Sequence, residues 1–204
     1  GRFRFGRTNP DQSISGLMSL LLTACEFNHE RPVSFADVTD PGFQSWLANF
    51  KRGLAGTSNS SGSLMKDMIA EGPSAFDAVV IFENLAIDYL KAAQGRWGDL
   101  HVAYLRRNMW SENPYYILDV PWSSPEQRRA AQAFLSFLLS EPLQRKALSH
   151  GFRPANINIP IREDMEGPFV RHKDRGLQIE FGSIYDPADA TATKELLKLW
   201  ERIK

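Results

Sequence analysis

Residues 3–27 read FRFGRTNPDQSISGLMSLLLTACEF, and this stretch decides the class of fold. Aromatic and polar residues alternate from position 2 to position 6, which is typical of a short strand. The following Thr8-Asn9-Pro10-Asp11 is typical of a turn. Apolar residues then recur at i, i+3, i+4 and i+7, namely Leu17, Leu20, Leu21 and Ala24, and predict a helix that runs to about Phe27. Other apolar residues fill the adjoining face, so we expect this helix to be buried.

The end of this helix, Leu22-Thr23-Ala24-Cys25, also looks like the cleavage box of a bacterial lipoprotein signal. The turn ahead of it and the potential caps Ser13 and Ser15 favour a buried helix instead. The apolar run at 17–25 is about half the roughly 20 residues that a membrane span needs. The sequence therefore predicts no span.

The amino-acid composition excludes several classes of function. With 204 residues, 43% of them hydrophobic and 24% charged, the chain can bury a core. Its 24 Lys+Arg balance 24 Asp+Glu, so no net charge attracts nucleic acid or an anionic membrane surface. One cysteine excludes an internal disulfide, and four histidines show no metal-ligand spacing. We expect no metal, no cofactor and no nucleic-acid partner.

Helices and strands alternate along the rest of the chain. Caps and apolar stripes predict helices starting at Asp40-Pro41, Leu64, Leu85 with Asn84 as cap, Ser124-Pro125, Ser140, and Asp186 or Asp189. β-branched and aromatic runs predict strands at 76–82, which we expect to be buried, and at 100–105 and 115–120. This alternation predicts an α/β protein.

The candidate site follows from that class, because α/β sheets bind ligands beyond the carboxyl ends of their strands. Three segments there carry short polar side chains: Thr8, Asn9, Ser13, Ser15 and Gly16; Ser60 and Ser61 within the hydroxyl-rich 57–63; and Glu83 with Asn84 after the strand at 76–82. The first two precede helices, whose first-turn N–H groups and positive dipole ends suit a polar or anionic ligand. Alternatively, the serines and Asn84 only cap their own helices and Glu83 is a solvated charge.

Two other interpretations remain open. Ser63 and Lys66 match the S-x-x-K of serine β-lactamases, which predicts a serine hydrolase or acyl-transfer enzyme, although no K-T-G follows. The other is a purely structural interaction module linked to an adhesion-type domain. The aromatic residues of 110–122 are expected in the core or at an interface, or stacked on a ligand such as a sugar: Trp110, Tyr115, Tyr116 and Trp122.

The order of several blocks resembles bacterial extracellular (periplasmic) solute-binding proteins, type II-like, of a branch often associated with von Willebrand A-type domains. The resemblance covers 5–160. The blocks are Thr8-Asn9-Pro10 with Ser13-x-Ser15-Gly16, Gly72-Pro73-x-x-Phe76-Asp77-Ala78-Val79, Phe82-Glu83-Asn84, Ala131-x-x-Phe134-Leu135-x-Phe137-Leu138-Leu139-Ser140-Glu141-Pro142-x-Gln144, and Gly151-Phe152-Arg153-Pro154.

The resemblance implies a three-layer α/β lobe with a mixed sheet and C-terminal helices over 1–160, and an extension over 161–204 whose last helix packs back on the body. It implies a non-enzymatic, extracytoplasmic protein of the bacterial periplasm or cell surface, binding a small polar or anionic solute for ABC transport or signalling. A membrane transporter or a von Willebrand A-type domain is the implied partner. The family's first lobe has no counterpart ahead of residue 3, so part of the cleft is expected outside this chain. The implied ligand-facing residues are Thr8, Asn9, Ser13, Ser15, Gly16, Ser60, Ser61, Glu83 and Asn84.

Overall fold

The computed structural model describes residues 3–180, 182–186 and 188–203. The chain forms two units: Gly1–Trp110 with Glu180–Lys204, and Ser111–Ile179. The expected division at residue 160 differs from this one, because the chain leaves the first unit at one strand, β4 (Arg107–Asn108), and re-enters it at another, β5 (Ser183–Ile184).

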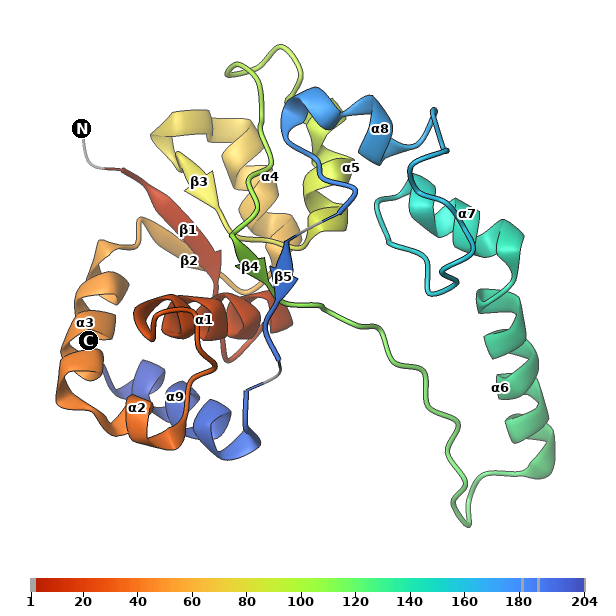
Figure 1. Ribbon diagram of the computed structural model, residues 1–204, viewed down its shortest axis with the longest axis horizontal. Helices are drawn as coiled ribbons and strands as arrows, with labels where there is room; N and C mark the ends of the chain where they lie inside the picture. The colour runs from red at the N-terminus through yellow and green to blue at the C-terminus, as the bar shows by residue number, and fades with distance from the viewer. Residues whose placement is uncertain (1–2, 181, 187, 204) are drawn as a thin grey trace. The chain divides into compact units, whose positions relative to one another are not determined.

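The first unit contains a small parallel sheet of order β2-β1-β3 (Figure 1). Its strands are β1 (Phe5–Thr8), β2 (Gly56–Ser58) and β3 (Ala78–Val79). Gly6 of the central strand pairs with Gly56 on one side and Val79 on the other. β4 and β5 form a separate parallel pair. The chain is therefore an α/β protein, but all pairings among the described residues are parallel, so the expected mixed sheet is not found there.

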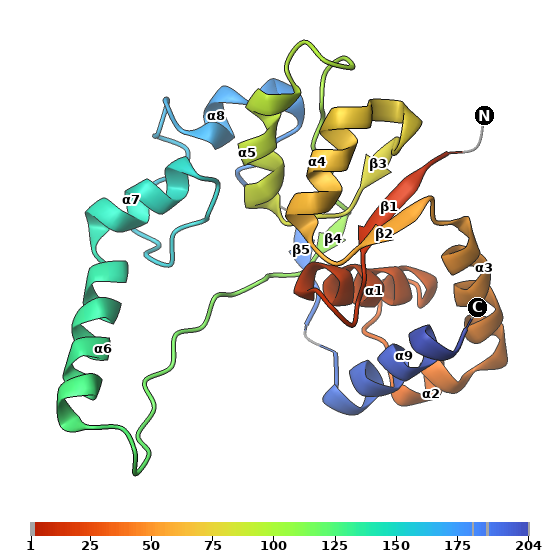
Figure 2. The ribbon, with the colours of Figure 1, turned by 180° about the vertical axis from the view of Figure 1, so that it is seen from behind.

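Helices cover both faces of this sheet. Each strand leads into a helix: β1 into α1 (Ile14–Phe27), β2 into α4 (Ser61–Glu71) and β3 into α5 (Glu83–Ala93). Figures 1 and 2 show α4 and α5 on one face, and α1 on the other with α9 (Ala190–Arg202) beyond it. The predicted start of α9 is confirmed, since Asp189 caps it. α4 begins at Ser61, with Ser60 as its cap, three residues before the predicted start at Leu64.

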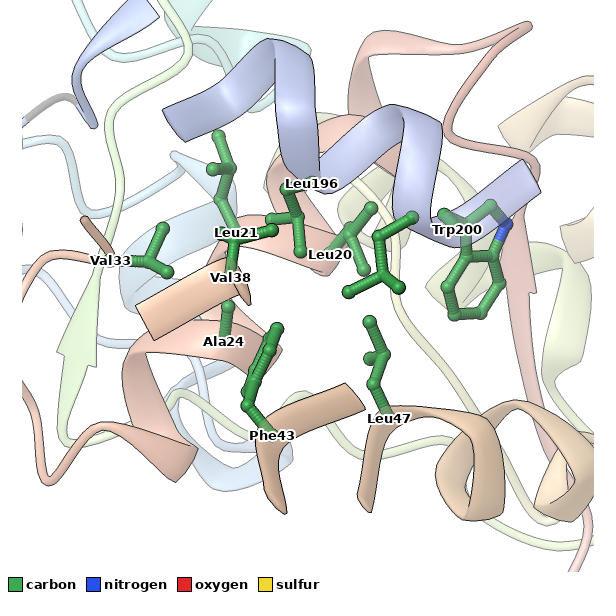
Figure 3. Close-up of a cluster of buried hydrophobic side chains, with 10 residues drawn as sticks. Leu20, Leu21, Ala24, Val33, Val38, Phe43, Leu47, Leu196 and Trp200 are labelled. Carbon is green, nitrogen blue, oxygen red and sulfur yellow. The ribbon is translucent and has the colours of Figure 1, made fainter. Parts of the chain in front are cut away.

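The main core lies where α1, α9, α2 (Phe35–Thr39) and α3 (Pro41–Gly53) meet (Figure 3). The burial predicted for α1 is confirmed, and fully burying one leucine side chain is worth about 1.5–3 kcal/mol. The last helix packs back on the body as expected, since α9 contacts α2. The core members are Leu20, Leu21, Ala24, Val33, Val38, Phe43, Leu47, Leu196, Leu199 and Trp200.

The second unit contains α6 (Pro125–Leu138), α7 (Glu141–Ser149), α8 (Pro168–Arg171) and a 3₁₀ turn, η2 (Lys173–Arg175). The predicted start of α6 is confirmed by a capping box between Ser124 and Gln127. α7 likewise starts after Ser140 as predicted. Few large apolar side chains are buried in this unit: Leu148, Ile159, Phe169 and Leu177.

Several predicted boundaries are wrong. The strand at 76–82 shrinks to Ala78–Val79 and is only half-buried, and a 3₁₀ turn, η1 (Gly72–Ser74), precedes it. The runs at 100–105 and 115–120 form no strand, because a β-prone segment needs a neighbouring ladder as well as the right residues. The first strand lies at Phe5–Thr8 instead of 2–6, and residue 2 falls outside the described part. The helix α2, with its capping box at Ser34 and Asp37, was not predicted.

The cap of α5 and the aromatic residues also differ from expectation. Phe82, not Asn84, occupies the N-cap position of α5. The four aromatic side chains expected in the core, at an interface or on a ligand are exposed, so none belongs to the core: Trp110, Tyr115, Tyr116 and Trp122.

Candidate functional site

Three helix N-termini meet the carboxyl edge of the sheet. Since β1, β2 and β3 run parallel, α1, α4 and α5, which follow them, all begin at that edge. The first-turn amides of a helix have no acceptor within the helix. At α1 and α5 the N-cap side chain supplies no acceptor either. This edge therefore presents several backbone donors and three positive dipole ends.

A cluster of four hydroxyl groups joins α1 to α4. Ser15 Oγ lies 2.7 Å from Thr8 Oγ1, 2.8 Å from Ser13 Oγ and 2.6 Å from Ser61 Oγ. The Asn9 amide also donates to the Ser58 carbonyl, at 2.8 Å. The two polar segments that the sequence singled out, around 8–16 and 58–63, thus lie side by side. We refer to Thr8, Ser13, Ser15 and Ser61 as the hydroxyl cluster.

Ser15 is the centre of this cluster and has no capacity left for a ligand. A serine hydroxyl offers one hydrogen and two lone pairs, and Ser15 spends all three on its neighbours. Two of the three surrounding hydroxyls must therefore donate to Ser15, which leaves one O–H of the cluster to point elsewhere. The cluster holds the two helix starts together, and the backbone amides remain the principal donors for a ligand.

The predicted site residues of the first two segments differ in burial. Some lie beneath the surface, and we call the more exposed ones, Asn9, Ser13 and Ser60, the rim. Thr8, Ser15 and Ser61 are 0%, 3% and 7% exposed, so they lie beneath the surface. Ser60 is exposed, and Asn9 and Ser13 are half-buried. Within these two segments, a solute can touch the side chains of the rim without displacing protein atoms.

Gly16 allows the loop after β1 to lie against the first turn of α1. A Cβ at this position would come within 2.6 Å of the carbonyl oxygens of Thr8 and Asn9. These are backbone atoms, which move less readily than a side chain, so a larger residue would push the loop away from the helix.

Arg7 is a buried cation beside the site, and our sequence analysis did not single it out. It is 0% exposed, its Nη2 donates to the Gly16 carbonyl at 2.7 Å, and its guanidinium lies 4.6 Å from the centre of the Trp200 ring. Burial lowers the pKa of Arg7 to about 10, so the group stays charged at neutral pH. Its Nε and Nη1 have no partner, and among the described residues no carboxylate pairs with it. The sequence did carry a signal for the burial of Arg7. Residues 5 and 7 of a strand lie on the same face, and Phe5 is apolar and contacts Phe50.

Glu83 and Asn84 occupy the first turn of α5, at the same edge of the sheet, and both are half-buried. The Tyr104 hydroxyl donates to Glu83 Oε1. The Glu83 carboxylate thus already accepts a hydrogen bond from the protein, which argues against its prediction as a ligand-facing group.

The alternative pair Ser63 and Lys66 lies on the outside of α4. Both residues are exposed, and the Ser63 amide donates to Ser60 Oγ at 3.5 Å. A lysine that activates a serine needs to be desolvated beside it. An exposed Lys66 does not meet that requirement.

The opposite, amino edge of the sheet has a cavity of about 630 Å³. It opens beside Arg4, at the start of β1, and is lined in part by Asp67 and Glu71 of α4. Its acidic lining does not suit the anion that the carboxyl edge favours. Over the described residues, no three His, Cys, Asp or Glu side chains gather closely enough to hold a metal, and none of the described helices has the length and apolarity to cross a bilayer.

Comparisons with protein families, with characterised proteins and with solved structures give no match for this chain.

Proposed function

We propose that this chain is the ligand-binding part of an extracytoplasmic solute-binding protein that captures a small anionic solute at the paired starts of α1 and α4. The observation that carries the proposal is the 2.6 Å hydrogen bond between Ser15 and Ser61, which brings the two helix starts together. A membrane transporter or a von Willebrand A-type domain is the partner that this function requires, in ABC transport or in signalling.

Charge favours an anion over a neutral solute. Each helix N-terminus carries about half a positive charge and a set of free amides. Arg7 adds a full charge that no carboxylate balances among the described residues, directly beneath the first turn of α1. A bound anion would compensate these positive charges, whereas a neutral solute would leave them unopposed.

Gly62 is the position at which this proposal is best tested. It is half-buried in the first turn of α4, and a Cβ there would lie 3.7 Å from Ser60 Oγ, an ordinary contact. A carboxylate at this position stabilises the helix through its dipole but repels an incoming anion. Gly62→Asp should therefore raise the stability of the fold while it lowers the affinity for an anion. A loss of binding in this variant cannot then be attributed to a loss of fold. Gly62→Asn has nearly the same shape without the charge and is the matched control.

The measurement is calorimetric titration and thermal unfolding with phosphate, sulfate and molybdate, each alone, and with a neutral monosaccharide for comparison. We expect at least one anion to stabilise the protein, by about 2.7 kcal/mol at 100 times its Kd, with no effect of the sugar. Gly62→Asp should weaken that binding at least about tenfold and Gly62→Asn much less. The proposal fails if no anion binds, or if the aspartate and asparagine variants bind equally.

A further inference from the structure

Arg7 of the central strand β1 is a buried charge whose surroundings do not neutralise it. The side chain is 0% exposed, and its Nη2 donates to the Gly16 carbonyl in the first turn of α1. That carbonyl carries no full charge, and Arg7 Nε and Nη1 have no partner among the described residues. A buried charge without a counter-charge costs stability, and buried polar groups are normally hydrogen-bonded. A role in binding would explain why the chain keeps an arginine here.

Lys51, near the end of α3, shows how a cation in the same part of the first unit is compensated. Arg7 lies 4.6 Å and Lys51 4.8 Å from the centre of the Trp200 ring. Lys51 Nζ also donates to the carbonyls of Trp200 and Ile203, at 2.6 and 2.9 Å, at the negative end of α9. Burial lowers the pKa of Lys51, and the attraction of the Asp11 carboxylate opposes this lowering. Lys51 is therefore compensated, whereas Arg7 is not.

The positive charge at the starts of α1 and α4 amounts to about two elementary charges. The two helix ends contribute about one between them, and Arg7 contributes the other. The segment 59–63, which leads into α4, contains no acidic residue. Asp11, which follows β1, is attracted to Lys51, and Glu83 accepts from Tyr104 and offsets the positive end of its own helix, α5. A doubly charged anion would balance the site, whereas a singly charged one would leave about one positive charge unopposed.

We propose that Arg7 makes this site select doubly charged anions over singly charged ones. The inference rests on the function proposed above and defines its class of solute. Because Arg7 is buried beneath the first turn of α1, it acts through its charge and not by touching the solute. Coulomb energy is proportional to the product of the two charges. Removing the charge of Arg7 should therefore cost a dianion twice the binding free energy that it costs a monoanion, so that the fold-loss of affinity for the dianion is the square of that for the monoanion.

The test compares sulfate with perchlorate, two tetrahedral oxyanions that differ by one charge. Calorimetric titration at one ionic strength measures both affinities in the wild-type protein, in Arg7→Met and in Arg7→Lys. Methionine fills a similar space beside Trp200 without the charge, and an apolar side chain of similar volume can replace a buried charge without loss of the fold. If Arg7→Met weakens perchlorate binding about threefold, it should weaken sulfate binding about tenfold. Arg7→Lys retains the charge and should keep most of the preference for sulfate.

Lys51→Met is the matched control, because it removes the other cation from the Trp200 ring. Lys51 is only half-buried, so solvent screens its charge, and the ratio of the two affinities should change less than about twofold. Equal fold-losses for sulfate and perchlorate in Arg7→Met would mean that Arg7 only shapes the site, which overturns this inference and leaves the proposed function standing. A wild-type protein that binds perchlorate as tightly as sulfate overturns it even if Arg7→Met does not fold. A wild-type protein that binds neither anion refutes the proposed function, and this inference with it.

Discussion

Helices α1 and α6 are both 14 residues long and both carry apolar side chains on more than one face, yet their environments differ. Leu20 and Ala24 of α1 are fully buried, whereas no residue of α6 is buried. α1 is enclosed by β1 and the other core helices of its unit. Within the second unit, α6 is half-buried on one side only. Apolar periodicity thus tells which faces need cover, and only the fold shows whether the chain supplies it.

The largest expected difference between the two helices is in the cost of truncating an apolar side chain. Leu20→Ala empties a fully buried position and should lower the free energy of unfolding by about 2–5 kcal/mol. Phe134→Ala removes a side chain that is half exposed and should cost less than about 1 kcal/mol. Urea unfolding followed by circular dichroism measures both values. Similar costs would mean that α6 is covered within its own chain.

A smaller effect is expected at Tyr185, whose hydroxyl donates to Glu26 Oε1 near the end of α1, at 3.2 Å. The ring is 3% exposed, and burial raises the pKa of Tyr185 to about 12. Between its ordinary value of 10 and about 12 the folded protein keeps a proton that the unfolded chain has lost. The stabilisation is therefore complete below pH 10 and disappears as the pH rises towards 12.

Tyr185→Phe should remove this pH dependence. Relative to the variant, the wild-type protein should lose about 2 kcal/mol of stability from pH 9 to 11.5, as two pKa units imply after allowance for local relaxation. Arg7 acts in the opposite direction over part of this range, because burial lowers its pKa, but it is present in both proteins and cancels in the difference. Urea midpoints at each pH give the comparison. A constant difference between the two proteins would show that Tyr185 titrates normally.

The starts of the helices could be predicted because their signals are local. The capping motif at Ser124-Pro125 and the aspartates Asp40 and Asp189 each act on amides two or three residues away, and all three helices begin where the sequence indicates. Strand extents could not be predicted in this way. Residues 115–120 have the β-branched and aromatic content of a strand but find no ladder partner among the described residues.

The candidate site was predictable only in outline. The sequence indicates an α/β protein, and from that class it follows that the segments around Ser15 and Ser61 begin helices near the carboxyl ends of strands. Their burial does not follow from it. Serines that only cap their own helices are normally found at the surface, whereas both of these hydroxyls are buried and bonded to each other. Replacing both by alanine would therefore disturb the fold as well as the site, because hydrogen-bonding groups would be left buried.

The smallest effect we expect concerns the cap of α6. Ser124→Ala breaks the capping box and should cost about 1 kcal/mol locally. Because α6 has no buried residue to hold it, amides of its first two turns should exchange with solvent about fivefold faster, while the unfolding of the first unit stays unchanged. Ser34→Ala is the matched control, since it breaks a capping box on α2, whose Val38 is buried in the core beside α9. There the same loss should lower the stability of the whole first unit. Hydrogen exchange read by mass spectrometry distinguishes the two, and a global loss from Ser124→Ala would show that α6 shares the stability of the core.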